Sequence, residues 1–330
     1  MRHDSEHFAA LDQAWEMFHE GDLDGALQAA LATLEVDEDS HEAHNLAGAI
    51  WSAKGFAEKG LRHFDHAIAV DDLFLEALIN GAEAALALGR PGDALRRLED
   101  ALELADNVDQ AADVLLLRVD AAVAMGDGDA ASATVAQLPE GPFESPQVVF
   151  LIGRAKLLVG DAAGAHEALE AALARGADDL DLHYHLALAR EAVGDLPGAM
   201  VAFLQCRERD MLLPDLPWTL PRAVFERRVQ EAVANLRTPL STALDGALVV
   251  VESAPGAEVV SEGVDPRAAA MMDEVPFRDG TEAIRRLFVY QRNIERSCAR
   301  AEDLPGEIEA RIGEEVEAFL AAPRPPAPTG

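Results

Sequence analysis

Cysteine is scarce in this chain of 330 residues, and histidine is absent after His185. The two cysteines, Cys206 and Cys298, form no Cys-x-x-Cys pair, which argues against a disulfide framework and against a thiolate zinc site. No run of 18 apolar residues occurs, and the first residues contain no apolar signal segment. We therefore expect a cytoplasmic protein.

Basic residues are also few: 27 Lys and Arg stand against 60 Asp and Glu, for a net charge of −33. This balance argues against nucleic acid or an anionic membrane as a partner. Most of the acidity lies in residues 1–210, where a solvated outer face is its simplest explanation. Neither the Gly-x-Ser-x-Gly motif of serine hydrolases nor a phosphate-binding Gly-x-x-x-x-Gly-Lys motif occurs.

A short turn that begins with glycine recurs along the first two thirds of the chain. The leading glycines are separated by 34, 34, 37, 34 and 34 residues: Gly21, Gly55, Gly89, Gly126, Gly160 and Gly194. A fixed period of 34 between apolar-periodic segments predicts stacked helical hairpins. The fourth repeat has three extra residues and two prolines, Pro139 and Pro142, so we expect its second helix to be short.

Residue size repeats as well when each repeat is counted from fourteen residues before its glycine. The eighth position is small in five of six repeats: Ala14, Gly48, Ala82, Val119, Gly153 and Ala187. The twenty-fourth is bulky in all but the first: Ala30, Phe64, Leu98, Val135, Leu169 and Phe203. This pattern resembles the tetratricopeptide repeat over residues 7–210. The resemblance implies a superhelical solenoid whose first helices line a concave face.

The resemblance also implies a ligand groove, because defined positions of the first helices line the concave face in that family. The corresponding residues are Trp15, Phe18, Asn45, Glu83, Asp120, Phe150, Arg154 and Tyr184. A carboxylate clamp of Lys, Arg and Asn, found in some members, is missing. We expect a protein or peptide partner that is apolar, or basic to match Glu83 and Asp120. Alternatively, several of these side chains pack against neighbouring helices.

Four histidines lie in the second repeat, as two pairs spaced three residues apart: His41 with His44, and His63 with His66. Antiparallel packing of the two helices is expected to bring His44 near His66. No carboxylate or thiolate accompanies them in an evident ligand pattern, so we predict no metal site there.

After Asp210 the period stops, and the rest of the chain has an α+β pattern. Residues 211–221 contain three prolines and predict a linker. We expect helices at 222–237, 293–300 and 306–320, buried strands at 247–252 and 287–290, a loose stretch at 257–284, and a disordered Pro-rich tail at 322–330.

Four sequence blocks in this part resemble the minimal zincin-like metallopeptidase domain of bacteria, over about residues 220–321. They are Val-Val-Val-Glu-Ser-Ala-Pro (249–255), Ser-Glu-Gly-Val (261–264), Phe-Val-Tyr-Gln-Arg-Asn-Ile-Glu (288–295) and the segment 304–320. The resemblance implies a His-Glu-x-x-His motif on the last helix. Its histidines would hold zinc, and its glutamate would act as general base.

The chain departs from that motif at both ligand positions. Gly313 and Glu317 replace the two histidines, and only Glu314 matches the catalytic glutamate. Glycine has no ligating atom, so we expect a catalytically inactive domain with Glu314 as a vestige. The alternative is an active zinc peptidase that uses Glu314 and Glu317 with Asp303 or a histidine of the repeats, and to which the repeats deliver substrate.

Together these patterns predict a mainly α protein: a solenoid of about six hairpins (1–210), a linker (211–221), a degenerate zincin-like domain (222–321) and a tail (322–330). The expected function is a non-enzymatic cytoplasmic scaffold that binds a protein or peptide without cofactor or metal. Stacked repeats with self-complementary ends would also allow a homo-oligomer.

Overall fold

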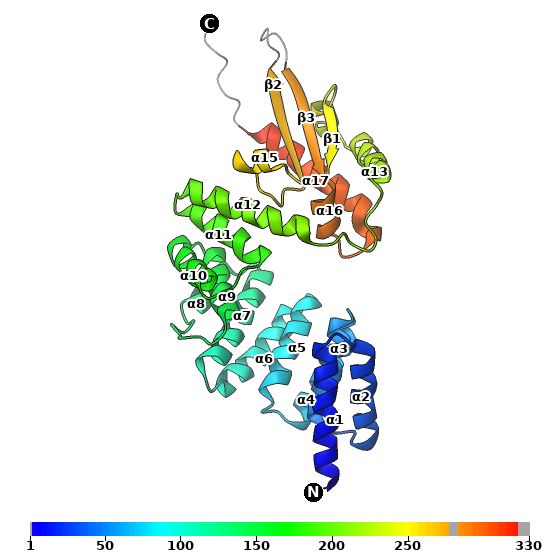
Figure 1. The fold of residues 1–330 in the computed structure, drawn as a ribbon, viewed down its shortest axis with the longest axis vertical. Helices are drawn as coiled ribbons and strands as arrows, with labels where there is room; N and C mark the ends of the chain where they lie inside the picture. Colours follow the sequence, from blue (N-terminus) through cyan, green and yellow to red (C-terminus); the bar gives the residue numbers. More distant parts are fainter. Residues whose placement is uncertain (1, 277–282, 323–330) are drawn as a thin grey trace. The chain divides into compact units, whose positions relative to one another are not determined.

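The computed structural model describes residues 2–276 and 283–322 (Figure 1). Contacts divide the chain into two compact units, which we call the N-terminal unit (residues 1–177) and the C-terminal unit (residues 178–330). The expected Pro-rich tail, apart from its first residue, and part of the expected loose stretch lie outside the described residues.

The N-terminal unit consists of five helical hairpins, as the 34-residue period predicts. Their helices are α1 Arg2–His19, α2 Leu23–Val36, α3 His41–Ala53, α4 Ala57–Val70, α5 Leu75–Ala87, α6 Pro91–Leu104, α7 Val108–Ala124, α8 Gly128–Val135, α9 Pro146–Leu158 and α10 Ala162–Ala174. Helix α8 has 8 residues, whereas α6 has 14 and α10 has 13. The expected short second helix of the fourth repeat is therefore confirmed.

The recurring Gly-Asp turn ends one helix and begins the next. Gly160 has φ +83°, a left-handed conformation that side chains other than glycine rarely adopt. The next residue, Asp161, is the N-cap of α10, where its carboxylate accepts a hydrogen bond of 3.0 Å from the backbone N–H of Gly164. The repeated sequence signal thus encodes a helix stop followed by a helix start.

Small and bulky residues meet where the two helices of a hairpin cross. A Cβ atom built on Gly48 of α3 would lie 2.6 Å from the ring of Phe64 on α4, and one built on Gly153 of α9 would lie 2.7 Å from Leu169 on α10. Both bulky side chains are buried. The small–large pattern in the sequence therefore reflects close packing within each hairpin.

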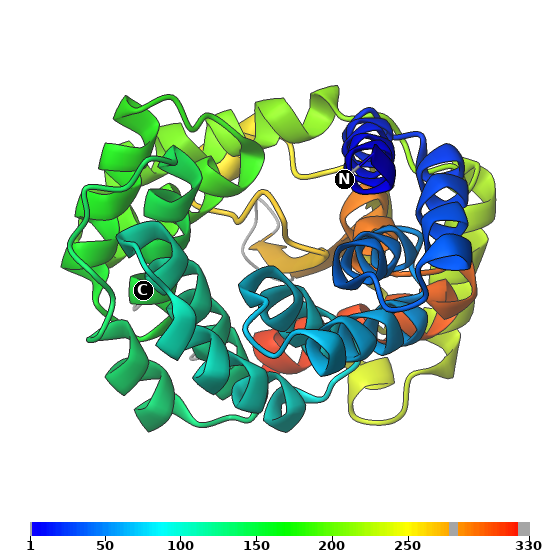
Figure 2. The same ribbon diagram turned by 90° about the horizontal axis from the view of Figure 1, so that it is seen from below.

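The first helices form the inner layer of the N-terminal unit. Consecutive first helices contact one another from α1 through α3, α5 and α7 to α9, whereas second helices contact mainly the first helices beside them. Figure 2 shows the hairpins following one another, from blue through teal to green. We call the surface of the first helices that faces away from the second helices the inner face.

The C-terminal unit combines a sixth hairpin with a small three-stranded domain. Its elements are α11 Leu180–Ala192, α12 Leu196–Leu212, α13 Arg222–Asn235, α14 Leu240–Ala243, β1 Leu248–Glu252, α15 Ala257–Ser261, β2 Ala270–Pro276, β3 Ala283–Tyr290, α16 Gln291–Ser297, the 3₁₀ turn η1 Ala301–Asp303 and α17 Leu304–Ala321.

The sheet has the strand order β1-β3-β2, with β1 parallel and β2 antiparallel to the central β3. Helices α13 and α17 share one hydrophobic core with the sheet, which includes Phe225, Leu287 and Ile308. The two expected strands are present. The interpretation of 257–284 as a loose stretch is wrong for residues 257–261, which form α15, for residues 270–276, where β2 pairs with β3, and for residues 283–284, where β3 begins.

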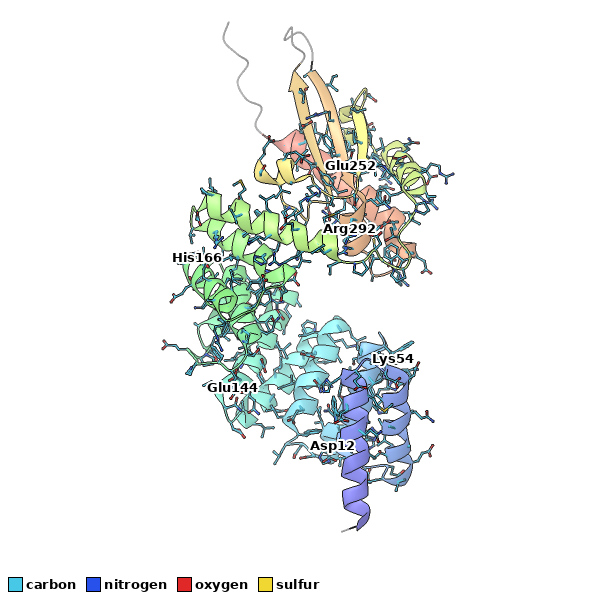
Figure 3. The ribbon with its side chains drawn as sticks, in the orientation of Figure 1. Asp12, Lys54, Glu144, His166, Glu252 and Arg292 are labelled. Carbon is cyan, nitrogen blue, oxygen red and sulfur yellow. The ribbon has the colours of Figure 1, made fainter. Side chains whose placement is uncertain are left out.

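Charged residues join the sixth hairpin to the α+β elements. Arg292 of α16, labelled in Figure 3, donates to the Asp210 carboxylate of α12 at 3.0 Å, to the Asp215 carboxylate at 2.7 Å, and to the carbonyls of Asp210 and Leu213. Arg296 pairs with Asp210 at 2.6 Å. By contacts the chain therefore divides before the sixth hairpin rather than at the Pro-rich segment 211–221. The sequence-based boundaries at 210 and 222 stay a prediction.

Candidate functional site

The groove residues predicted on α3, α5, α7 and α9 interact with residues of neighbouring first helices, through hydrogen bonds in two cases and through charge alone in a third. The first pair joins two amides: Asn80 Nδ2 on α5 donates to Asn45 Oδ1 on α3 at 2.9 Å. Asn45 is buried, with 3% of its surface exposed, so its amide holds two helices together rather than facing a ligand.

The second pair consists of two carboxyl groups, those of Glu83 on α5 and Asp113 on α7. Both side chains reach solvent, yet the surrounding protein desolvates them. Desolvation raises the pKa of Glu83, and the nearby charge of Asp113 raises it further. Desolvation likewise raises the pKa of Asp113, with a further contribution from Asp109. Among the described residues, neither Glu83 nor Asp113 forms an ion pair, so the negative charge of these two residues is uncompensated.

The third pair is an ion pair between α7 and α9. Arg154 Nη2 donates to both carboxylate oxygens of Asp120, at 2.9 and 3.0 Å. The Nε of Arg154 is buried and has no hydrogen-bond partner among the described residues. Asp120 is thus neutralised within the protein, and it is a weaker candidate for binding a basic ligand than the Glu83–Asp113 pair.

The aromatic members of the predicted groove differ in exposure. Trp15 on α1 is partly exposed and contacts Phe18 edge-on, with ring centroids 5.7 Å apart. Phe150 on α9 is buried, with 4% of its surface exposed. Trp15 can therefore contact a ligand directly, whereas Phe150 serves as packing in this conformation.

Tyr184 lies on α11 in the C-terminal unit, where residues of the same unit already engage it. Its hydroxyl donates to the Asp265 carboxylate at 2.9 Å, and the guanidinium of Arg267 lies 4.1 Å from its ring centroid. Arg267 also pairs with Asp181 of α11. In this structure the loop between α15 and β2 thus covers the residue that the sequence places in the groove.

In the three pairs between first helices, Asp113 and Asn80 were not among the predicted site residues. Asp113 is the second residue of its repeat, a position that lines the concave face in tetratricopeptide repeats, so this signal could have identified it. Asn80 is the sixth residue of its repeat and carries no such signal. Its role follows only from its contact with Asn45.

The histidines of the second repeat do gather. The rings of His44 and His66 stack with centroids 4.0 Å apart, as expected, and the Nδ1 atoms of His44 and His63 lie 2.9 Å apart. Burial lowers the pKa of His44 and of His63. Across residues 2–276 and 283–322, no group of three or more His, Cys, Asp or Glu side chains could hold a metal ion.

Helix α17 places Gly313, Glu314 and Glu317 along one open cavity of about 900 Å³. The opposite wall is the segment 236–240, between α13 and α14. Glu314 pairs with Arg311 at 2.8 Å, and neighbouring Glu315 accepts a hydrogen bond from the backbone N–H of Met272 on β2. Burial raises the pKa of Glu315. These residues do not fit a zinc ion, because Gly313 offers no ligand and the Glu314 carboxylate is bound to a guanidinium.

Comparison with known proteins identifies the fold of the hairpins. No protein-family model matches the chain, and no curated protein matches it in sequence. A structure of PilF from Pseudomonas aeruginosa matches with a TM-score of 0.54 and 15% identity, covering 63% of this chain and 93% of that one. PilW, a type IV pilus biogenesis factor, gives 0.51 and 16%, covering 63% and 94%. The Cut9–Hcn1 hetero-tetramer gives 0.52 and 13%, covering 63% and 41%.

At this identity the likeness concerns the fold alone, and it shows that the hairpins form a tetratricopeptide-type solenoid. None of these comparisons supports the predicted zincin-like domain. Within the described part of the chain, no helix is both long and apolar enough to cross a membrane.

Proposed function

We propose that the chain is a non-enzymatic scaffold that binds a protein or peptide segment along the inner face of the N-terminal unit. The observation that carries this proposal is the Glu83–Asp113 pair. The two carboxyl groups, on α5 and α7, are exposed yet partly desolvated, the charge of Asp113 raises the pKa of Glu83, and no described cation pairs with either. A Lys or Arg side chain of a partner would supply the missing charge.

A cationic side chain of a partner would compensate the negative charge of Glu83 and Asp113. Partial desolvation penalises the charged form of each carboxyl group, and repulsion by Asp113 adds to the penalty on Glu83. A bound cation lowers both contributions and forms charge-assisted hydrogen bonds in a site that already excludes part of the solvent. Trp15 offers an apolar surface on the same layer of helices, so the partner segment should combine basic and apolar residues.

For the C-terminal unit, we propose a peptidase-like domain without catalysis, located with the rest of the chain in the cytoplasm. The geometry around Gly313 and Glu314 supports only the absence of catalysis, because the residues described there offer no ligand set for zinc; the peptidase-like fold rests on the sequence blocks alone. Incubating the full-length protein with unstructured substrate proteins and zinc should yield no cleavage. Cleavage that disappears with a chelator and in Glu314→Gln would instead favour the alternative of an active peptidase.

Selection from a displayed random-peptide library on the immobilised full-length protein tests the scaffold function. We expect peptides that combine Lys or Arg with apolar residues. Their affinity should fall about tenfold or more in the Glu83→Gln, Asp113→Asn double variant. The matched control is Glu99→Gln, which removes an exposed carboxylate on α6, the second helix of the same hairpin. Equal losses in both variants, or no recovered peptide, would refute the proposal.

A further inference from the structure

Gly313 of α17 lines the cavity but is itself buried, because Leu236 and Leu240 of the opposite wall lie against it. A Cβ atom on Gly313 would meet nothing nearer than the methyl groups of Leu236 and Leu240, each at 3.9 Å, which is ordinary van der Waals contact. Glycine inside a helix is less favourable than alanine by about 1 kcal/mol. Gly48 differs, because its Cβ would lie 2.6 Å from the ring of Phe64. The absence of a side chain at Gly313 therefore leaves space beside the cavity. The absence of a side chain at Gly48 instead allows Phe64 to pack closely.

Carboxylates flank Gly313 on the same face of the helix. Glu309 and Glu317 lie four residues before and after Gly313, and all three line the cavity. Both glutamates are exposed, and neither forms an ion pair with any residue that the structure describes. Arg237 on the opposite wall is one cation among the lining residues. The cavity thus has an apolar centre with an unpaired negative charge on each side.

We propose that this cavity binds an extended peptide segment with the pattern basic–x–apolar–x–basic. Eight helical residues separate Glu309 from Glu317, a distance of about 12 Å along α17. In an extended segment, alternate side chains point to the same face, and residues i and i+4 lie about 13 Å apart. The two basic side chains would reach Glu309 and Glu317, and the apolar side chain between them would contact Leu236 and Leu240, which cover Gly313.

The dimensions agree with a segment of this length. A volume of about 900 Å³ is in the range of sites that enclose a small ligand or a short peptide. The apolar residue of the peptide would bury apolar surface, and its two basic residues would fix its position. An acidic residue in place of either basic residue would lie next to a glutamate of the cavity and be repelled. This site is separate from the Glu83–Asp113 pair and does not depend on it.

Fluorescence anisotropy on the full-length protein tests the proposal with the labelled probe Arg-Ser-Leu-Ser-Arg. Saturable binding at physiological ionic strength is expected, weakened about tenfold or more when Leu of the probe is replaced by Ser. In Gly313→Leu the new side chain would displace Leu236 and Leu240 toward the cavity and should weaken binding at least tenfold, and an unchanged urea unfolding curve would show that the C-terminal unit keeps its fold. Glu309→Gln and Glu317→Gln should each weaken binding.

Asp245→Asn is the matched control, since it removes an exposed carboxylate of the same unit outside the cavity and should leave the affinity unchanged. If the probe bound equally well with and without its leucine, or if Gly313→Leu left its affinity unchanged, its binding would reflect general charge attraction. Either result would overturn the proposal. Loss of binding in Glu83→Gln alone would assign the probe to the inner face of the repeats, and would equally overturn it. If partner binding at the Glu83–Asp113 pair were refuted, these experiments would still test peptide binding in the cavity beside α17.

Discussion

Replacing Asp210 by alanine should destabilise the C-terminal unit more than almost any other exchange of a single carboxylate there. Asp210 accepts from Arg292 Nε at 3.0 Å and from Arg296 Nη1 at 2.6 Å. The side chain of Arg292 is only 9% exposed, so the variant leaves a buried guanidinium partly uncompensated. Removing one partner of a buried ion pair costs about 3–5 kcal/mol. We expect about 3 kcal/mol, the lower end of that range, because Arg292 keeps its bonds to Asp215 and to two backbone carbonyls.

For a folding unit of this size, about 3 kcal/mol corresponds to a decrease in Tm of roughly 6–12 °C. Trp218 packs against the core of the C-terminal unit, so its fluorescence reports on this unit once Trp15 and Trp51 are replaced by Phe. Urea unfolding followed by this signal gives the change in free energy. Asp245→Ala is the control and should change it by less than about 0.5 kcal/mol. A loss in Asp210→Ala no larger than in Asp245→Ala would refute the reasoning.

Three further predictions concern the N-terminal unit. Its free energy of unfolding should fall as the pH drops below about 6.5. The pKa values of His44 and His63 are lowered in the folded state, so the unfolded chain binds more protons at these pH values. A His63→Gln variant whose free energy of unfolding, from urea titrations, changes with pH as steeply as that of the parent would contradict this. Gly48→Ala should destabilise the unit by about 1–3 kcal/mol, because the new methyl group overlaps the ring of Phe64; an unchanged melting curve would show that the ring moves freely. Glu83→Gln should raise the Tm at pH 7, because the raised pKa of Glu83 means that its charged form is less favourable in the folded than in the unfolded protein. The increase in Tm should vanish below about pH 4.5, where Glu83 is protonated in both the folded and the unfolded protein.

The hairpins could be predicted from the sequence because their signals are local. Gly160 and Asp161 end one helix and cap the next with contacts that span a few residues, and the pattern repeats. Strand β2 could not be predicted in this way. Its sequence includes Asp273, Glu274 and Pro276 and has one β-branched residue, Val275. It is extended because it pairs with β3, where Asp273 bonds to Arg286 across the strands.

The candidate site shows the same division between local and long-range information. The repeat position predicts that Glu83 lies on the inner face. Whether Tyr184 is free to contact a ligand depends instead on Asp265, which is 81 residues away in the sequence. The boundary at 210 stays a prediction, and it likewise rests on local signals alone. Prolines mark the segment 211–221 as a linker, yet Arg292 joins the two sides of it through contacts that no local pattern encodes.

In-cell photo-cross-linking tests the central proposal, partner capture on the inner face, most directly. A photoreactive residue in place of Ala87 would lie one helical turn from Glu83 on the same face of α5, at an exposed position. The same residue in place of Glu99 on α6 serves as the comparison. The account predicts a discrete cross-linked protein from position 87 that disappears with Asp113→Asn and does not form from position 99. The same adducts from both positions, or none from position 87, would contradict it.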